Sequence, residues 1–270
     1  MEVNMNLFLH EIKMYWRSLL YWSLGMIAMI GGGMIEFSGY YNSDSQVIAQ
    51  FMDKFPKAFM ALFGMVNLDI TSLAGYYGIL HLYLVIMGAV YAIILGAGIL
   101  SKEERDKTVE FLMSKPVARS WVLFQKFLAG FVYILGFVAV DVFISLIFVA
   151  QAAPKENITN QMLLLSLSMI LIMLAFFCVA FGLSAAMRDN RKSSGIMISF
   201  VSANYLISVY MDLVSNSDWL RPFVLFKYFP TDVIFKTMAL DIQYVGFSLI
   251  WIIVGLGVAF IGFQKRDMRI

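Results

Sequence analysis

The stretch ITSLAGYYGILHLYLVIMGAVYAIILGAGILS, residues 70–101, runs for 32 residues without a lysine, arginine, aspartate or glutamate. A helix needs about 20 apolar residues to cross the hydrocarbon core of a bilayer, which is about 30 Å thick. The stretch is therefore long enough to cross a membrane once and too short to cross it twice. We predict one membrane-spanning helix here.

Similar long apolar stretches recur along the chain, and only one of them contains a charged residue, Asp141. These stretches cover residues 18–35, 127–154, 162–187, 193–211 and 242–264. The predicted fold is an all-α integral membrane protein with six transmembrane helices. We place these helices at about 18–37, 78–100, 121–149, 162–187, 194–212 and 245–263.

The composition supports the same fold class. Of the 270 residues, 61% are hydrophobic and 14% are charged, and the mean hydropathy is +0.79. Soluble domains are about 25% charged, so these figures exclude an ordinary soluble enzyme. The net charge of +2 does not favour a nucleic-acid partner. One cysteine and two histidines allow no internal disulfide and do not favour a dedicated metal cluster.

Lysine and arginine are distributed unevenly between the two sets of loops. Fourteen of them flank one side of the predicted helices and six flank the other. Because cytoplasmic loops carry the excess of basic residues, we predict that both termini are cytoplasmic. The loops 101–120 and 188–193 are then also cytoplasmic, whereas 38–77, 150–161 and 213–244 face outside. Residues 264–270 form a basic cytoplasmic tail.

Residues 1–17 have the pattern of an amphipathic helix that precedes the transmembrane domain, 18–263. One face carries apolar side chains at helical spacing and the other carries polar ones. The apolar set is Met5, Phe8, Leu9, Ile12, Tyr15, Trp16 and Leu19, and the polar set is Asn6, His10, Lys13 and Arg17. We predict an interfacial helix that turns into the first span. It is either a simple anchor or an elbow that touches a cytoplasmic partner.

The loop at 101–120 has the features of a short helix. Ser101 and Glu104 form a capping-box pattern at its start, and Pro116 ends it. Within this charged element, Val109, Leu112, Met113 and Pro116 form an apolar stripe. The stripe either lies on the lipid headgroups or docks into another protein.

Residues 104–119, ERDKTVEFLMSKPVAR, resemble the same loop in ABC-2 type transporter permeases, where E-x(3)-T-x-E-F-L-L-S-x-P-x-x-R is common. Met113 replaces the usual leucine. The turn at 182–192 and the tail at 263–268 are also similar to those of the family. The resemblance implies that this loop is a coupling helix seated in a groove of a separate ATP-binding subunit. The implied coupling residues are Glu104, Thr108, Val109, Glu110, Phe111, Leu112, Met113, Pro116 and Arg119.

The resemblance further implies an exporter in a bacterial cell membrane. It would contain two ATPase subunits and a second permease chain, identical or paralogous, and its cargo is open. The chain has no G-x(4)-G-K-[ST] phosphate-binding loop. ATP and magnesium would therefore be bound by the partner, and this chain would hold no cofactor and no catalytic residue. The glycine clusters inside the spans are predicted to serve close helix packing.

Asp141 and His81 are the candidate residues of the bundle interior. A charged residue inside a span is a candidate for function, because it faces the bundle interior or water. Asp141 could contact cargo, relay protons, or pair with a tyrosine or with His81. For His81, near the outer end of the second span, an interfacial hydrogen bond is expected.

Two other functions are compatible with parts of the sequence. Asp141 could serve an ion-coupled transporter or channel that needs no ATPase. An intramembrane protease is disfavoured, because Ser184 would need a histidine on a facing helix, and an aspartyl site would need two buried aspartates. In the outer loops, apolar residues interrupted by Pro56, Pro222 and Pro230 predict short broken helices, which the resemblance makes a lid over the exit.

Overall fold

A computed structural model of the chain describes residues 2–40, 54–105, 118–187, 190–214 and 216–265. The regular secondary structure in these ranges is helical throughout. Six helices there are long and apolar enough to cross a membrane, and their bounds are Leu7–Gly39, Leu73–Leu100, Arg119–Ala152, Thr159–Ala186, Ser193–Leu213 and Ile242–Lys265. A helix satisfies its own backbone hydrogen bonds, as the bilayer interior requires. The prediction of an all-α membrane protein with six spans is confirmed.

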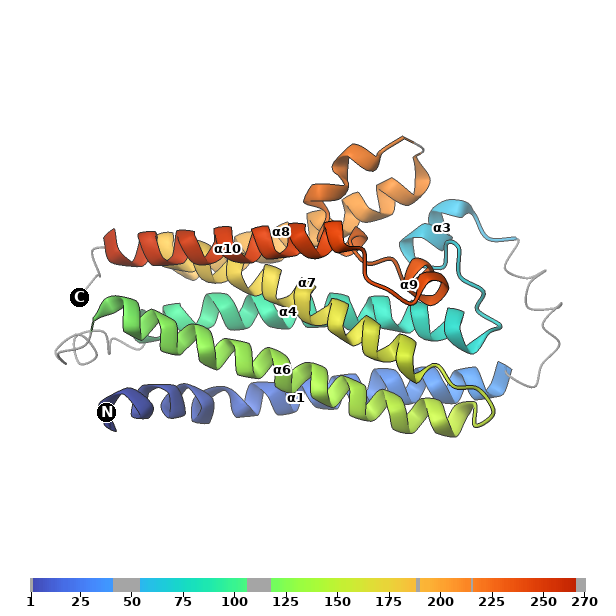
Figure 1. The fold of residues 1–270 in the computed structure, drawn as a ribbon, viewed down its shortest axis with the longest axis horizontal. Helices are drawn as coiled ribbons and strands as arrows, with labels where there is room; N and C mark the ends of the chain where they lie inside the picture. Colours follow the sequence, from blue (N-terminus) through green and yellow to red (C-terminus); the bar gives the residue numbers. More distant parts are fainter. Residues whose placement is uncertain (1, 41–53, 106–117, 188–189, 215, 266–270) are drawn as a thin grey trace.

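The long helices form a bundle, and the short elements gather at one end of it (Figure 1). The long helices are α1 (Glu2–Tyr40), α4 (Leu73–Arg105), α6 (Arg119–Ala152), α7 (Thr159–Ala186), α8 (Asn190–Leu213) and α10 (Ile242–Lys265). The short ones are α3 (Lys57–Leu62), the 3₁₀ helices η1 (Asp218–Phe223) and η2 (Leu225–Lys227), and α9 (Thr231–Thr237). We call the end where α1 begins and α10 ends the terminal end, and the end with α3 and α9 the far end.

The second span begins earlier than predicted, at Leu73 instead of 78. The hydroxyl of Ser72 accepts the backbone N–H of Gly75 at 3.1 Å, and so caps the first turn. Just before it, the Asp69 carboxylate accepts the N–H of Thr71 at 2.9 Å. These polar residues fix the start of α4, although the apolar pattern alone suggests a later one.

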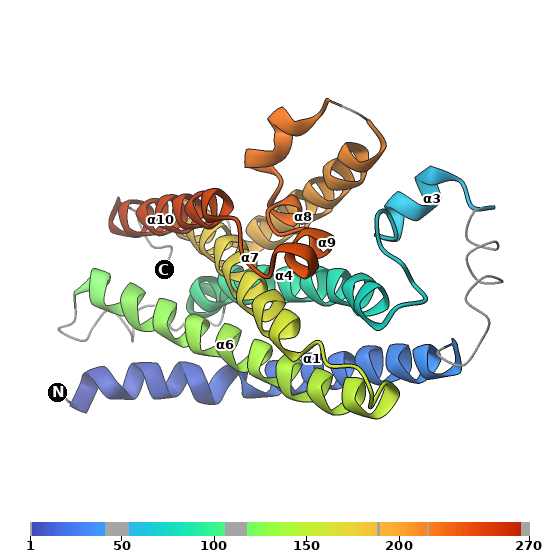
Figure 2. The same ribbon diagram turned by 45° about the vertical axis from the view of Figure 1, so that its right-hand side comes forward.

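The N-terminal segment differs from the expected interfacial elbow. α1 runs for 39 residues without a break, so residues 2–17 form the first turns of the spanning helix itself. The sequence has no proline or glycine before Gly25, and nothing there interrupts the helical hydrogen bonds. Tyr133 of α6 also donates a hydrogen bond to the carbonyl of Ile12. The segment therefore lies along α6, as both views show (Figures 1 and 2).

α7 lies at the centre of the bundle, where it packs against α10 and α4. Glycines allow the backbones to approach closely at these contacts. A Cβ added at Gly255 of α10 would lie 2.5 Å from the backbone of Cys178, and one at Gly96 of α4 would lie 2.7 Å from the carbonyl of Phe177. The predicted packing role of the glycine clusters is confirmed at these two positions.

A matched pair of glycines on α10 tests this packing. We expect Gly255→Val to lower the free energy of unfolding by about 1–3 kcal/mol or more, because its side chain would meet the backbone of α7. Gly257→Val is the control, since a Cβ there meets no atom within 4 Å. Thermal unfolding in detergent, followed by size-exclusion chromatography, measures the difference. Equal midpoints for the two variants would contradict the close contact.

Candidate functional site

Asp141 lies inside the bundle, on the face of α6 that packs in the interior. Its side chain is fully buried, and neither carboxylate oxygen has a hydrogen-bond partner among the residues that the structure describes. Ser145, one turn further along α6, is also fully buried, and its hydroxyl has no such partner in the described chain. Two polar side chains of α6 thus share one buried face.

α4 contributes two more polar side chains to this region. Tyr77 and His81 lie one turn apart with their rings stacked at 6.3 Å between centroids, and Tyr77 interacts electrostatically with Asp141. Both are buried, with exposed fractions of 0% and 3%. Both His81 ring nitrogens make no hydrogen bond within the described ranges, and the Tyr77 hydroxyl has Ser145 as its neighbour on α6. We call Tyr77, His81, Asp141 and Ser145 the interior polar cluster.

The cluster bears on what was expected of its members. Of the three roles left open for Asp141, pairing with a tyrosine is represented by its neighbour Tyr77, although no hydrogen bond joins the two. His81 is buried, so it does not make the expected interfacial hydrogen bond. Each buried polar group without a partner costs about 1–3 kcal/mol, and such groups in a native structure call for a functional explanation.

Replacement of Asp141 by asparagine tests whether its buried carboxylate serves transport. We expect Asp141→Asn to raise the free energy of unfolding by about 1–3 kcal/mol, because the amide is easier to bury and can donate to the neighbouring hydroxyls. We also expect slower transport, since a costly buried group that is retained commonly serves function. Thermal unfolding and transport assays on the same preparation measure both effects. A more stable variant with unchanged transport would remove Asp141 from the candidate site.

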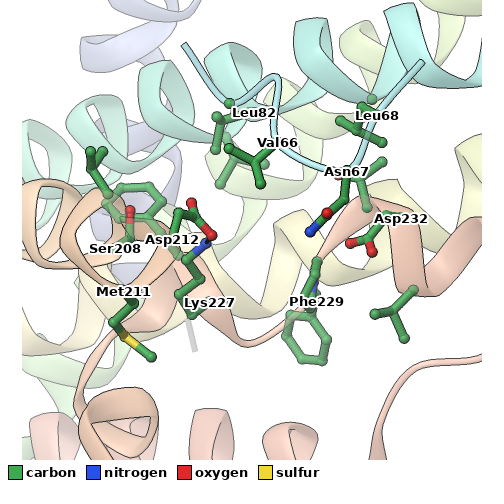
Figure 3. A pocket seen from close by; sticks show the side chains of 18 of the residues that line it. Val66, Asn67, Leu68, Leu82, Ser208, Met211, Asp212, Lys227, Phe229 and Asp232 are labelled. Atoms are coloured by element: carbon green, nitrogen blue, oxygen red, sulfur yellow. Dashed lines mark hydrogen bonds and ion pairs between the residues drawn. The ribbon is translucent and has the colours of Figure 1, made fainter. Parts of the chain in front are cut away.

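A cavity of about 300 Å³ opens beside His81 at the far end of the bundle. Its lining comes from α4, α7, α8, α9 and the segments around α3 and η2, and includes His81 itself. We call this cavity the far-end pocket. Figure 3 shows Asp212 and Lys227 on one side of it and Asn67, Phe229 and Asp232 on the other. Through His81 the pocket adjoins the interior polar cluster.

Tyrosines hold the segment after α3 against the bundle. Tyr83 of α4 donates to the carbonyl of Phe63 at 3.1 Å, and Tyr205 of α8 donates to that of Leu62. Gly64 follows with a φ of 68°, and a Cβ there would lie 2.2 Å from the side chain of Leu82. Only glycine fits such a site, because it is both left-handed and in contact with α4. These contacts form one wall of the pocket.

The opposite wall is fixed by hydrogen bonds around η2. Asn204 of α8 donates to the carbonyl of Phe223 at 2.8 Å, and Lys227 forms an ion pair with Asp212. Tyr228 accepts the indole N–H of Trp251 at 2.9 Å, and burial raises the pKa of its hydroxyl. The broken helices predicted in loop 213–244 are present and form this wall.

A buried ion pair at the terminal end was not predicted. The ammonium of Lys126 on α6 lies 2.6 Å from a carboxylate oxygen of Glu11 on α1, and both side chains are almost completely buried. Lys126 also donates to the carbonyl of Ile99 on α4 at 2.7 Å. We call this arrangement the three-helix clamp, because it joins α1, α4 and α6. The sequence did contain one indication of a buried charge here, because Lys126 lies within the predicted third span.

The amino-acid sequence was compared with models of known protein families. The family model described as ABC-2 family transporter protein matches residues 5–268, which is almost the whole chain. The chain belongs to the ABC-2 transporter family. No curated protein matches it significantly. Membership makes it a membrane component of a transporter, in agreement with the six spans.

In this ABC-2 chain, most of the predicted coupling residues lie outside the described residues. This applies to Thr108, Val109, Glu110, Phe111, Leu112, Met113 and Pro116. Glu104 falls in the last turn of α4, and Arg119 begins α6, where its guanidinium donates to the carbonyl of Gln264 at 3.5 Å. The two helices that bracket the loop therefore meet it at the terminal end, next to the three-helix clamp.

The ABC-2 fold does not bring together the residues of a serine protease site. Ser184 donates a hydrogen bond to the carbonyl of Ala97 at 3.1 Å. His81 lies 16 residues before Ala97 on α4, which corresponds to about 24 Å along a helix. This separation of Ser184 from His81 also disfavours an intramembrane serine protease.

Proposed function

We propose that the chain is the permease subunit of an ATP-driven exporter in a bacterial cell membrane. The observation that carries the proposal is the family match over residues 5–268 of a chain with six membrane-spanning helices. In the proposed complex, two copies of a separate ATPase subunit bind ATP and magnesium. A second permease chain, identical or paralogous, completes the pathway.

In this proposal, energy from the ATPase enters through the loop 101–120. The excess of basic residues on that side supports a cytoplasmic location for the loop and for both termini. The described ends of α4 and α6 support a direct link from the loop into the bundle, since Lys126 and the Ile99 carbonyl lie close to it. The far-end pocket then faces outside.

The test is purification of the full chain from its native membranes in mild detergent. The proposal expects an ATPase subunit to co-purify and ATP hydrolysis by the preparation to be sensitive to vanadate. Transport in proteoliposomes should then require ATP inside the compartment that contains the loop. A chain that purifies alone and transports without ATP would overturn the proposal.

The interior polar cluster favours one alternative, an ion-coupled transporter. A buried carboxylate without a hydrogen-bond partner in the described chain can bind and release a cation or proton. The alternative expects transport driven by a pH or sodium gradient with no nucleotide present. The same proteoliposomes distinguish the two functions.

A further inference from the structure

The far-end pocket has the features of a binding site for a small ligand. Its volume of about 300 Å³ is at the lower end of the range for ligand pockets. Leu82, Val85, Ile172, Phe226 and Phe229 give it an apolar lining. His81 also lines it, nearly fully buried, with both ring nitrogens lacking hydrogen-bond partners in the described ranges.

The charges that line the pocket indicate the sign of that ligand. Three aspartates and two basic side chains line it, and the basic ones are already engaged. Lys227 pairs with Asp212, while the guanidinium of Arg221 lies 4.4 Å from the ring centroid of Tyr244 and donates to the carbonyl of Lys227 at 3.1 Å. The wall therefore has one more negative than positive charge, which favours a cation.

Asp232 is the acid best placed to receive a cation. Its carboxylate has an exposed fraction of 23%, and its only ion pair in the described chain is with Lys236, at 3.8 Å. Lys236 is 73% exposed, and such surface pairs contribute little. Figure 3 shows Asp232 near Asn67 at the cavity. Asn67 has a φ of 63°, a left-handed conformation that asparagine tolerates better than most residues.

We propose that the far-end pocket binds an organic cation, a primary ammonium group attached to a small apolar body. Asp232 is the counter-ion, the Asn67 amide oxygen accepts an N–H hydrogen bond, and the apolar lining holds the body. This inference goes beyond the proposed function, because binding here needs neither ATP nor the ATPase subunit.

Equilibrium dialysis with the full chain in phosphatidylcholine nanodiscs tests the proposal. Benzylammonium and benzoate serve as probes of similar size and opposite charge, and empty nanodiscs give the background. We expect saturable binding of benzylammonium at one site per chain and no saturable binding of benzoate. Absence of benzylammonium binding, or equal binding of both probes, would overturn the proposal.

Two variants separate the pocket from the surrounding surface. Asp232→Asn should weaken benzylammonium binding about tenfold or more, because a hydrogen bond to a charged group contributes at least that factor. Asp241→Asn is the control, since Asp241 is an exposed acid on the same loop outside the pocket. Each variant must elute like the parent protein. Unchanged affinity in Asp232→Asn, or equal losses in both variants, would contradict the assignment.

A further experiment distinguishes two sources of the ammonium group, a lipid headgroup and a free amine. Nanodiscs that contain phosphatidylethanolamine present the same group on a lipid. Competition by this lipid for benzylammonium supports a lipid headgroup as the natural occupant, whereas undiminished benzylammonium binding supports a free amine. If the protein shows no ATP-dependent transport but still binds benzylammonium, only the proposed function is contradicted.

Discussion

Replacement of Leu112 by aspartate is expected to abolish co-purification of the ATPase subunit while the chain remains inserted in the membrane. In the proposed complex, Val109, Leu112 and Met113 form the apolar ridge of the coupling helix. Burying one such side chain contributes roughly 1.5–3 kcal/mol, and a buried unpaired carboxylate adds a further penalty. Insertion should be unaffected, because the loop does not cross the bilayer.

The amount of ATPase subunit retained per permease chain measures this effect. Lys107→Ala is the control, since a charge at the rim of an interface contributes little to binding. Vesicles should show loss of ATP-dependent transport in Leu112→Asp and near-normal transport in Lys107→Ala. Retention of the ATPase with normal transport in Leu112→Asp would contradict the coupling role and favour the ion-coupled alternative.

Replacement of Lys126 by methionine is expected to destabilise the fold by about 3–5 kcal/mol, the usual cost of breaking a buried ion pair. The variant leaves the Glu11 carboxylate buried without its cation and removes the hydrogen bond to the Ile99 carbonyl. The expected result is a large fall in the yield of folded protein and in its thermal midpoint. Fluorescence-detected chromatography of the detergent extract measures both.

The double variant Glu11→Leu, Lys126→Met separates the ion pair from simple loss of a side chain. It removes both charges, so it should recover much of the lost stability. Lys155→Met, at an exposed position, is the control and should behave like the parent protein. If the single and double variants are equally unstable, the ion pair is not the source of the stability.

The six spans could be predicted from sequence because a bilayer tolerates few charges, so charge-free windows locate the helices. The continuity of α1 with the first span could not be predicted in the same way. The amphipathic spacing of residues 1–17 predicted a separate interfacial helix, whereas Glu11 of this segment pairs with Lys126, 115 residues further along the chain. A pairing between residues so far apart leaves no trace in the local pattern.

The far-end pocket could be predicted only in part. Prolines and apolar clusters in the outer loops predicted short helices, and these are present as α3, η1, η2 and α9. Their meeting around His81 depends on tertiary contacts, such as the tyrosine hydrogen bonds to Leu62 and Phe63. The sequence identified His81 and Asp141 separately, but nothing in their spacing placed them around Tyr77.

The continuity of α4 has a mechanical consequence for a transporter. One uninterrupted helix bears His81 in the pocket wall and ends at Arg105, where the predicted coupling segment begins. These two residues are 24 positions apart, or about 36 Å along a rigid rod. A tilt of about 5° pivoting at Arg105 would displace the pocket wall by about 3 Å over that length. A small push at one end of α4 would thus change the width of the far-end pocket at the other end by leverage along the helix.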